Sequence, residues 1–378
     1  MSPFAQATLQ ALLLCSDEKV VRVLRRVLTD LEIGVEHCTH LDLAIQKLTR
    51  QRFEAVIVDC TTPVIAAKIL KGIKSAPANN RAIAVAIIND HEGLKRAFEL
   101  GTHFVLMKPI ELDRTKASFR SVRALMKRER RRHARIPVEL SVKIHLERAG
   151  RTLHVHTADL SENGMAIKTR VQLPPSFSLQ FELPGSSTDI QCRGEIAWEG
   201  RPLQGIRFRD VPEHASAQLK SWIARQLVSD ADDPPVNCRL TDLSLSACYL
   251  ETESPFPVRT RLQIAMRVGD LELQAEGLVR VMHPGSGMGV QFTRTSEEES
   301  KKVENFIHAL VSNEGSFPEV EVKPDSIDNT PEAFSEGRAG GDKDDPLLSL
   351  FHLGAELPAD DFHAELHKQR GASQEVPA

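Results

Sequence analysis

The sequence predicts a multidomain chain of α/β and all-β parts: a doubly wound, flavodoxin-like domain, two small antiparallel β-barrels each with a C-terminal helix, and a disordered tail. Three observations predict this fold class. The first third alternates short apolar runs with amphipathic stretches, the middle alternates apolar and polar residues with period two, and two parts of the middle repeat each other. The 378 residues are about two and a half times the length of an average domain, so several domains are expected.

Residues 8–127 are predicted to form the doubly wound domain. The run Val56–Val58 is continuously apolar, as in a strand buried on both faces, whereas residues 20–31 place apolar side chains at helical spacing. In such sheets the chemistry lies beyond the carboxyl ends of the strands. Asp17, Asp59 and Lys108 follow three of the predicted strands, so we expect these side chains to lie together.

This first domain resembles the receiver domain of response regulators, with Asp59 after its strand and Lys108 before Pro109. The resemblance implies that Asp59 is the phosphoacceptor and that Lys108 contacts the phosphoryl group. Ser16 stands where the family usually carries an acidic magnesium ligand, which leaves Asp17 and Asp59 as candidate Mg²⁺ ligands. We therefore expect magnesium only if the receiver is active. The alternative is a pseudo-receiver used for docking or dimerisation.

Residues 128–229 are predicted to form the first barrel, which begins with an arginine cluster and continues into a tight polar turn. Arginine offers a planar fork that grips phosphate or the edge of guanine, and its face stacks on bases. Carboxylate, hydroxyl and glycine in the turn supply an acceptor, a short polar group and close backbone approach. The candidate binding residues are Arg130, Arg131, Arg135, Asp159, Ser161 and Gly164.

The pattern R-x-x-x-R followed by D-x-S-x-x-G resembles the PilZ domain, and Gly205-Ile206-Arg207-Phe208 resembles a later strand of that family. The resemblance implies binding of the bacterial second messenger cyclic di-GMP by these residues. Two alternatives remain for the arginines: a solvated basic linker, or nonspecific nucleic-acid binding. Aromatic residues make up only 5% of the chain, which disfavours a single-strand binder, and we expect no DNA partner.

Residues 234–312 repeat the first barrel at an offset of 83 to 84 residues, with Asp242 matching Asp159 and Phe306 matching Trp222. A repeat of this kind indicates a duplicated structural unit. In the second copy Ala247 replaces the glycine, and no R-x-x-x-R precedes the turn. We expect this degenerate barrel to bind no nucleotide and to serve in packing or partner recognition.

Residues 313–378 are rich in Glu, Asp, Pro, Gly and Ser and are predicted to form a disordered acidic tail. An apolar island at 346–351 interrupts this composition and is a candidate docking motif. His363 and His367 have i, i+4 spacing, but no third ligand lies nearby in the sequence, so we expect no metal there.

The remaining composition excludes several classes of protein. Six scattered cysteines without C-x-x-C spacing suit the reducing cytoplasm, and no apolar run is long enough to insert in a membrane. Catalytic triads, a P-loop and signatures for making or degrading the messenger are absent from the sequence, so we expect no enzyme and no cofactor. The expected function is that of a cyclic di-GMP-binding adaptor that changes its contacts with an unknown protein partner. The alternative is a scaffold, or a phosphorylation-responsive receiver, with vestigial barrels.

Overall fold

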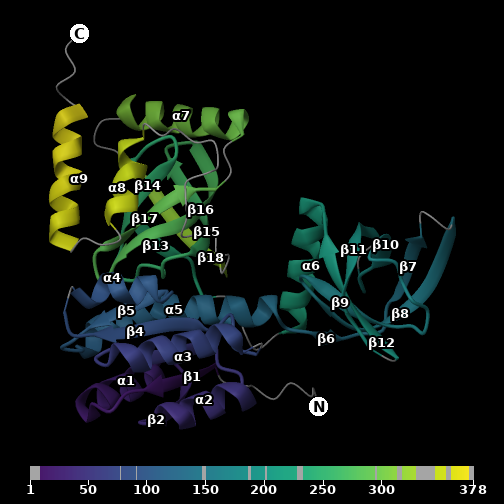
Figure 1. Ribbon diagram of the computed structural model, residues 1–378. Coiled ribbons are helices and arrows are strands. Elements are labelled where there is room, and N and C mark those ends of the chain that lie inside the picture. The colour runs from purple at the N-terminus through teal and green to yellow at the C-terminus, as the bar shows by residue number, and fades with distance from the viewer. Residues whose placement is uncertain are drawn as a thin grey trace. The chain divides into compact units, whose positions relative to one another are not determined.

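The computed structural model describes residues 9–76, 78–90, 92–146, 150–185, 189–200, 202–227, 233–293, 296–312, 317–328, 345–354 and 359–373 (Figure 1). The chain divides into two compact units. One combines the segment up to Glu129 with the segment from Asp233 onward, and the other runs from Arg130 to Asp232. Among the described residues, no helix has the length and apolar character needed to cross a bilayer.

The first domain is a five-stranded parallel sheet with helices between the strands, as predicted. Its strand order is β2-β1-β3-β4-β5, the flavodoxin-like order of doubly wound sheets. The central strand β3 and its neighbour β4 are buried along almost their whole length, which explains their continuous apolar sequences. The elements are β1 (Leu9–Leu14), α1 (Glu18–Asp30), β2 (Ile33–Cys38), α2 (Leu41–Arg50), β3 (Ala55–Asp59), α3 (Pro63–Ser75), β4 (Ile83–Ile88), α4 (Glu92–Glu99), β5 (Phe104–Met107) and α5 (Leu112–Arg132).

The first barrel is a closed antiparallel sheet whose ring order is β8-β7-β10-β11-β12-β9, completed by pairing of β9 with β8. A short strand, β6, adds to the outer edge of β8. Helix α6 buries Leu219, Trp222 and Ile223 against the barrel core, which confirms the predicted C-terminal helix of this barrel. The elements are β6 (Ile136–Pro137), β7 (Ser141–Leu146), β8 (Arg151–Ser161), β9 (Gly164–Lys168), β10 (Ser176–Glu182), β11 (Asp189–Glu199), β12 (Leu203–Arg209) and α6 (Glu213–Gln226).

The second barrel is also closed, with the ring order β13-β14-β17-β16-β15-β18. Its strands follow the first barrel at the offset of the repeat, with one exception. The position that β7 holds between β8 and β10 is held here by β18, which pairs antiparallel with β13 and β15 and follows the helix. The second barrel is therefore a circular permutation of the first. The elements are β13 (Val236–Leu243), β14 (Ala247–Glu251), β15 (Thr260–Val268), β16 (Leu271–His283), β17 (Gly287–Phe292), α7 (Glu297–Ser312) and β18 (Glu319–Ile327).

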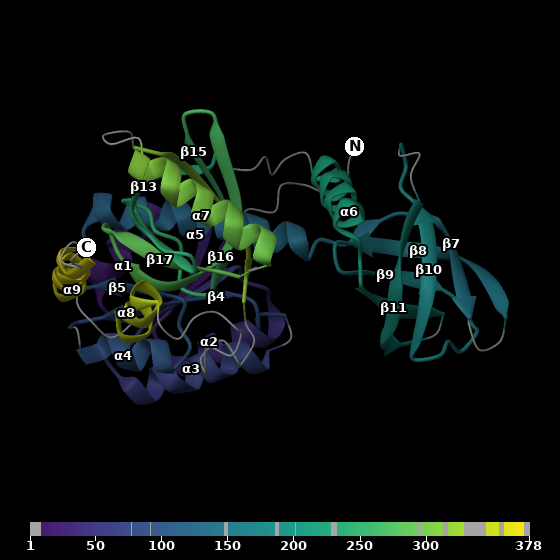
Figure 2. The ribbon, with the colours of Figure 1, turned by 90° about the horizontal axis from the view of Figure 1, so that it is seen from above.

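The expectation of a disordered tail from residue 313 is wrong for three segments. Strand β18 completes the second barrel, so that barrel extends beyond the expected boundary at 312. Helices α8 (Pro346–Gly354) and α9 (Ala359–Ser373) pack against the same barrel, and both views show α8 beside it (Figures 1 and 2). The apolar island thus docks on its own chain. Residues 313–316, 329–344, 355–358 and 374–378 lie outside the described residues.

The receiver-like domain and the second barrel share one hydrophobic core, in which Phe119 and Val122 of α5 join Phe256. Hydrogen bonds reinforce the contact: the Ser121 hydroxyl donates to the Pro255 carbonyl over 2.8 Å, and both atoms are buried. Charged side chains of α5 also bind this barrel's first residues, because Arg123 and Lys127 both contact the Asp233 carboxylate. Helix α5 is therefore fixed to the second barrel over its turns from Phe119 to Lys127.

We expect β18 to be indispensable for the second barrel. A chain ending at Ser312 lacks it, and the facing edges of β13 and β15 then carry unpaired backbone groups, a template for aggregation. Thermal unfolding and size-exclusion chromatography should show a loss of cooperative unfolding and the formation of aggregates. A chain ending at Asp328 keeps the strand and serves as the matched control. Equal stability of the two truncated proteins would contradict the structural role of β18.

Stability should also depend on pH through His283. This histidine is 4% exposed, and burial together with nearby His363 lowers its pKa from 6.5 to about 4. Between these pH values the unfolded chain takes up a proton that the folded chain does not, so stability is greatest above pH 6.5 and falls as the pH drops toward 4. The loss should reach about 3 kcal/mol over that window. Denaturant unfolding of the wild type and of His283→Gln at both ends of the window tests this, and parallel pH profiles would refute it.

Candidate functional site

The first barrel brings Arg135 and Asp159 into direct contact. Strand β6 pairs with β8 so that Ile136 faces Leu160 and Pro137 faces Asp159, which places the preceding Arg135 beside the carboxylate. The Arg135 Nη1 atom lies 3.0 Å from Asp159 Oδ1, with the side chains 51% and 25% exposed. The same carboxylate oxygen accepts from the Ala166 backbone N–H at 3.3 Å. The guanidinium is therefore oriented while half of it remains accessible to a ligand.

Ser161 and Gly164 build the turn between β8 and β9. The Ser161 hydroxyl donates to the Gly164 carbonyl at 2.9 Å, and the side chain is 8% exposed. A Cβ atom on Gly164 would overlap the Ile206 carbonyl oxygen of β12, so the glycine is needed for strand pairing. We expected the glycine to admit a ligand, whereas here it admits the backbone of β12. These two residues shape the wall of the site by fixing its turn.

The second barrel forms the corresponding turn without glycine. The Ser244 hydroxyl lies 3.0 Å from the Ala247 backbone nitrogen, which donates to it, and 3.2 Å from the Ala247 carbonyl oxygen. A serine in this position thus holds the turn in both copies. The serine and the turn are features of the fold, and the arginines distinguish the first copy from the second.

Arg130 and Arg131 lie in the last turn of α5, where cations are favourable at the negative end of the helix dipole. Arg131, one of the candidate ligand-binding residues, is only 5% exposed. Asn163 was not singled out from the sequence, yet its side-chain amide lies 3.5 Å from the Arg132 carbonyl and links the β8–β9 turn to the end of the helix. Its signal was a short amide side chain within a turn sequence.

The receiver-like domain gathers its expected residues at the carboxyl end of its sheet. Lys108 Nζ lies 2.9 Å from Asp59 Oδ2 and 3.8 Å from Asp17 Oδ2, and Asp17 also caps α1 by accepting from two backbone N–H groups. Thr61 donates to Asp59 Oδ1 through its backbone N–H and its hydroxyl. Burial alone would raise the pKa of Asp59, but hydrogen bonds from Thr61 and Lys108 outweigh it and hold this pKa below its ordinary value.

In this arrangement Lys108 and Cys15 hold part of the space beside Asp59 that a magnesium ion would need. The Lys108 ammonium contacts both Asp17 and Asp59, and the Cys15 thiol lies 3.3 Å from Asp59 Oδ2. Magnesium requires several oxygen ligands in octahedral geometry, and a thiol and an ammonium supply none. Within the described residues, no group of three or more acidic, histidine or cysteine side chains could hold a metal ion.

Comparison with known proteins finds a family match over both barrels. The family model of the PilZ domain matches residues 129–225 and again residues 226–309. No curated protein matches the chain.

Similar solved structures match the first domain. The receiver domain of sensor histidine kinase PA1611 from Pseudomonas aeruginosa shares 21% identity over 31% of this chain and 95% of its own, with a TM-score of 0.28. The chemotaxis response regulator CheY4 of Vibrio cholerae shares 17% identity over 31% of this chain and 99% of its own, with a TM-score of 0.29. The strand order found above is itself the order of the receiver fold. Two successive stretches of the chain therefore match the PilZ domain, and they follow a domain with the flavodoxin-like strand order.

Proposed function

We propose that the first barrel binds cyclic di-GMP and that the protein is a signalling effector whose contacts with a protein partner change on binding. The observation that carries this proposal is the contact of Arg135 with Asp159, inside a PilZ domain that has both the R-x-x-x-R and the D-x-S-x-x-G sequence. An anionic, guanine-containing ligand matches this chemistry, since a guanidinium pairs with phosphate or with the O6 and N7 atoms of guanine.

The proposed roles follow from the positions of the side chains. Arg135 is already oriented by Asp159 and half exposed, so it makes the first contact. Arg131 is buried and must leave its present position to join a ligand, with Arg130 assisting from the same helical turn. Binding would therefore rearrange the end of α5. A conformational change of this kind gives the ligand a way to alter a partner surface.

The second barrel is proposed to bind no nucleotide. It is permuted, so in the described part of the chain β13 is its first strand and has no counterpart of β6 and β7 before it, and no R-x-x-x-R sequence precedes Asp242. Both kinds of domain are signalling domains, and no enzymatic step is part of this proposal. All six cysteines are free thiols, which supports action in the cytoplasm.

Arg135→Ala should weaken binding of cyclic di-GMP roughly tenfold to a hundredfold, because it removes a bidentate contact worth about 1–3 kcal/mol. Arg209 offers the matched control. It pairs with Glu195 over 2.8 Å at 49% exposure on the same barrel, so Arg209→Ala removes a similar surface ion pair whose two side chains are not among the proposed binding residues. Isothermal titration calorimetry of the full chain with cyclic di-GMP measures both dissociation constants.

Two controls make this titration decisive. Cyclic di-AMP should bind far more weakly than cyclic di-GMP if guanine is recognised, and Arg131→Ala should reduce affinity as Arg135→Ala does. Losses below twofold in both arginine variants, or equal losses in Arg209→Ala, would contradict the proposed site. If only nonspecific phosphate contacts were made, affinity would fall steeply with salt and would ignore the base.

The receiver-like site favours a second candidate function, phosphorylation of Asp59. The carboxylate is ionised and contacts Lys108, which could neutralise an incoming phosphoryl group. The test is incubation with acetyl phosphate and Mg²⁺ followed by mass spectrometry, with Asp59→Asn as the control. A phosphoaspartate at this position in the wild type alone would support a phosphorylation-responsive protein. Its absence would leave the domain as a docking platform.

A further inference from the structure

Helices α8 and α9 cover one outer face of the second barrel with apolar side chains. Leu347, Leu350 and Phe351 of α8 have the i, i+3, i+4 spacing of a helix that lies in a groove, and α9 adds Phe362 and Leu366 at i, i+4. On the barrel side they pack against Ala247, Tyr249 and Val281. Figures 1 and 2 both place α8 beside this barrel. We call the covered face, formed by Ala247, Tyr249, Val281, His283 and Gly289, the helix groove.

The groove is shaped to receive the two phenylalanines. A Cβ atom on Gly289 would lie 2.7 Å from the Phe351 ring, so the glycine leaves room for that ring. The Phe362 ring centroid lies 5.3 Å from that of Tyr249 and 4.5 Å from that of His283. At the centre, the Tyr249 hydroxyl lies 3.1 Å from His283 Nδ1 and 3.5 Å from His363 Nε2 of α9. The contact combines aromatic anchors with a buried polar centre.

The helix groove corresponds to the candidate nucleotide site of the first barrel. By the offset of the repeat, Ala247, Tyr249 and Gly289 correspond to Gly164, Ala166 and Gly205. Gly164 and Ala166 belong to the turn and strand that hold Asp159. The second copy has lost the arginines and has gained, on the same face, a large aromatic residue and a helical covering.

The covering segment has the properties of a docked peptide. Helix α8 has only nine residues, too few for a stable helix by itself in water, so it depends on the groove for its order. The segment supplies the N-cap of this helix itself, because the Asp345 carboxylate accepts from the backbone N–H groups of Leu347 and Leu348 at 3.0 and 3.2 Å. Sixteen residues separate it from Asp328 at the end of the barrel, enough chain to let it leave and return.

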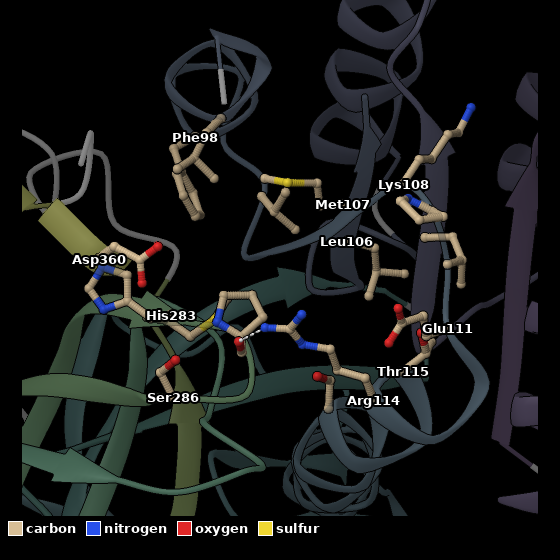
Figure 3. A pocket seen from close by; sticks show the side chains of 17 residues that line it. Phe98, Leu106, Met107, Lys108, Glu111, Arg114, Thr115, His283, Ser286 and Asp360 are labelled. Atoms are coloured by element: carbon tan, nitrogen blue, oxygen red, sulfur yellow. Dashed lines mark hydrogen bonds between the residues drawn. The ribbon is translucent and has the colours of Figure 1, made fainter. Parts of the chain in front are cut away.

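We propose that the helix groove is a binding site for an amphipathic helical peptide, and that the segment from Asp345 to Leu366 is its resident, displaceable ligand. The partner that fits is a helix with leucine and phenylalanine anchors and acidic residues outside them. The acidic preference follows from the resident segment, whose Asp360 lines a pocket of about 380 Å³ into which the Arg114 guanidinium of α5 reaches (Figure 3). This inference does not depend on nucleotide binding by the first barrel.

The test uses the full chain and a fluorescein-labelled peptide of residues 345–366, with fluorescence anisotropy as the readout. In the wild type the tethered segment competes at an effective concentration on the order of millimolar, so the peptide should bind weakly. In Phe351→Asp the groove is vacated, and the peptide should bind at least tenfold more tightly. Phe317→Asp is the matched control, since Phe317 is 72% exposed outside the groove and the same change there should leave binding as weak as in the wild type.

Specificity and folding are tested separately. A peptide carrying aspartate at positions 351 and 362 should not bind the vacated groove. A protease site placed between residues 328 and 345 of an otherwise wild-type chain provides the second measurement: after cleavage, excess unlabelled peptide should displace the C-terminal fragment on size-exclusion chromatography. A fragment that never exchanges, or a cooperatively folded Phe351→Asp protein that fails to bind the peptide, would overturn the proposal.

Discussion

Both barrels depend on pairing every strand of a small antiparallel sheet on both of its edges. A ring of six strands leaves no unpaired edge, and the apolar side chains can then fill its interior. The first barrel meets this requirement with β7, and the second meets it with β18, which lies in the same position and direction but comes from the other end of the repeat. The family match ends at residue 309, before β18 begins, so the strand that completes the second barrel lies outside the recognised domain.

The features of the fold that depend on local sequence patterns were predicted from the sequence. Period-two alternation and the constant repeat offset were enough to predict two successive barrels, each with a C-terminal helix, and the two motifs were enough to name Arg135 and Asp159 as candidates for one site. Burial of Arg131 could not be predicted, because it depends on tertiary packing rather than on spacing. Strand β18 was missed although Glu319, Val320, Glu321 and Val322 alternate as a strand does, since the acidic composition around them indicated disorder. The docking of α8 depends on long-range contacts that no local pattern contains.

Helix α5 begins in the unit of the receiver-like domain and the second barrel, and its last residues belong to the unit of the first barrel. Most of the helix is fixed to the second barrel by a shared core and by ion pairs, whereas its last residues, from Arg130, belong to the unit of the first barrel. The receiver-like site and the helix groove thus share one compact unit, and the candidate nucleotide site lies in the other. Phosphorylation of Asp59 and ligand binding at Arg135 would therefore begin in different units. Helix α5 is the element of the chain common to both units.

The permutation of the second barrel also affects the order in which the protein can fold as it leaves the ribosome. The first barrel has all six strands once β12 has emerged, and its helix follows. The second barrel cannot close its ring until α7 and then β18, up to Ile327, have also been synthesised. Until then the edges that β18 pairs with stay open. Because domains fold as units during synthesis, the first barrel can be folded while the second is still incomplete. The receiver-like domain, made earlier, then offers α5 as the surface on which the late barrel assembles.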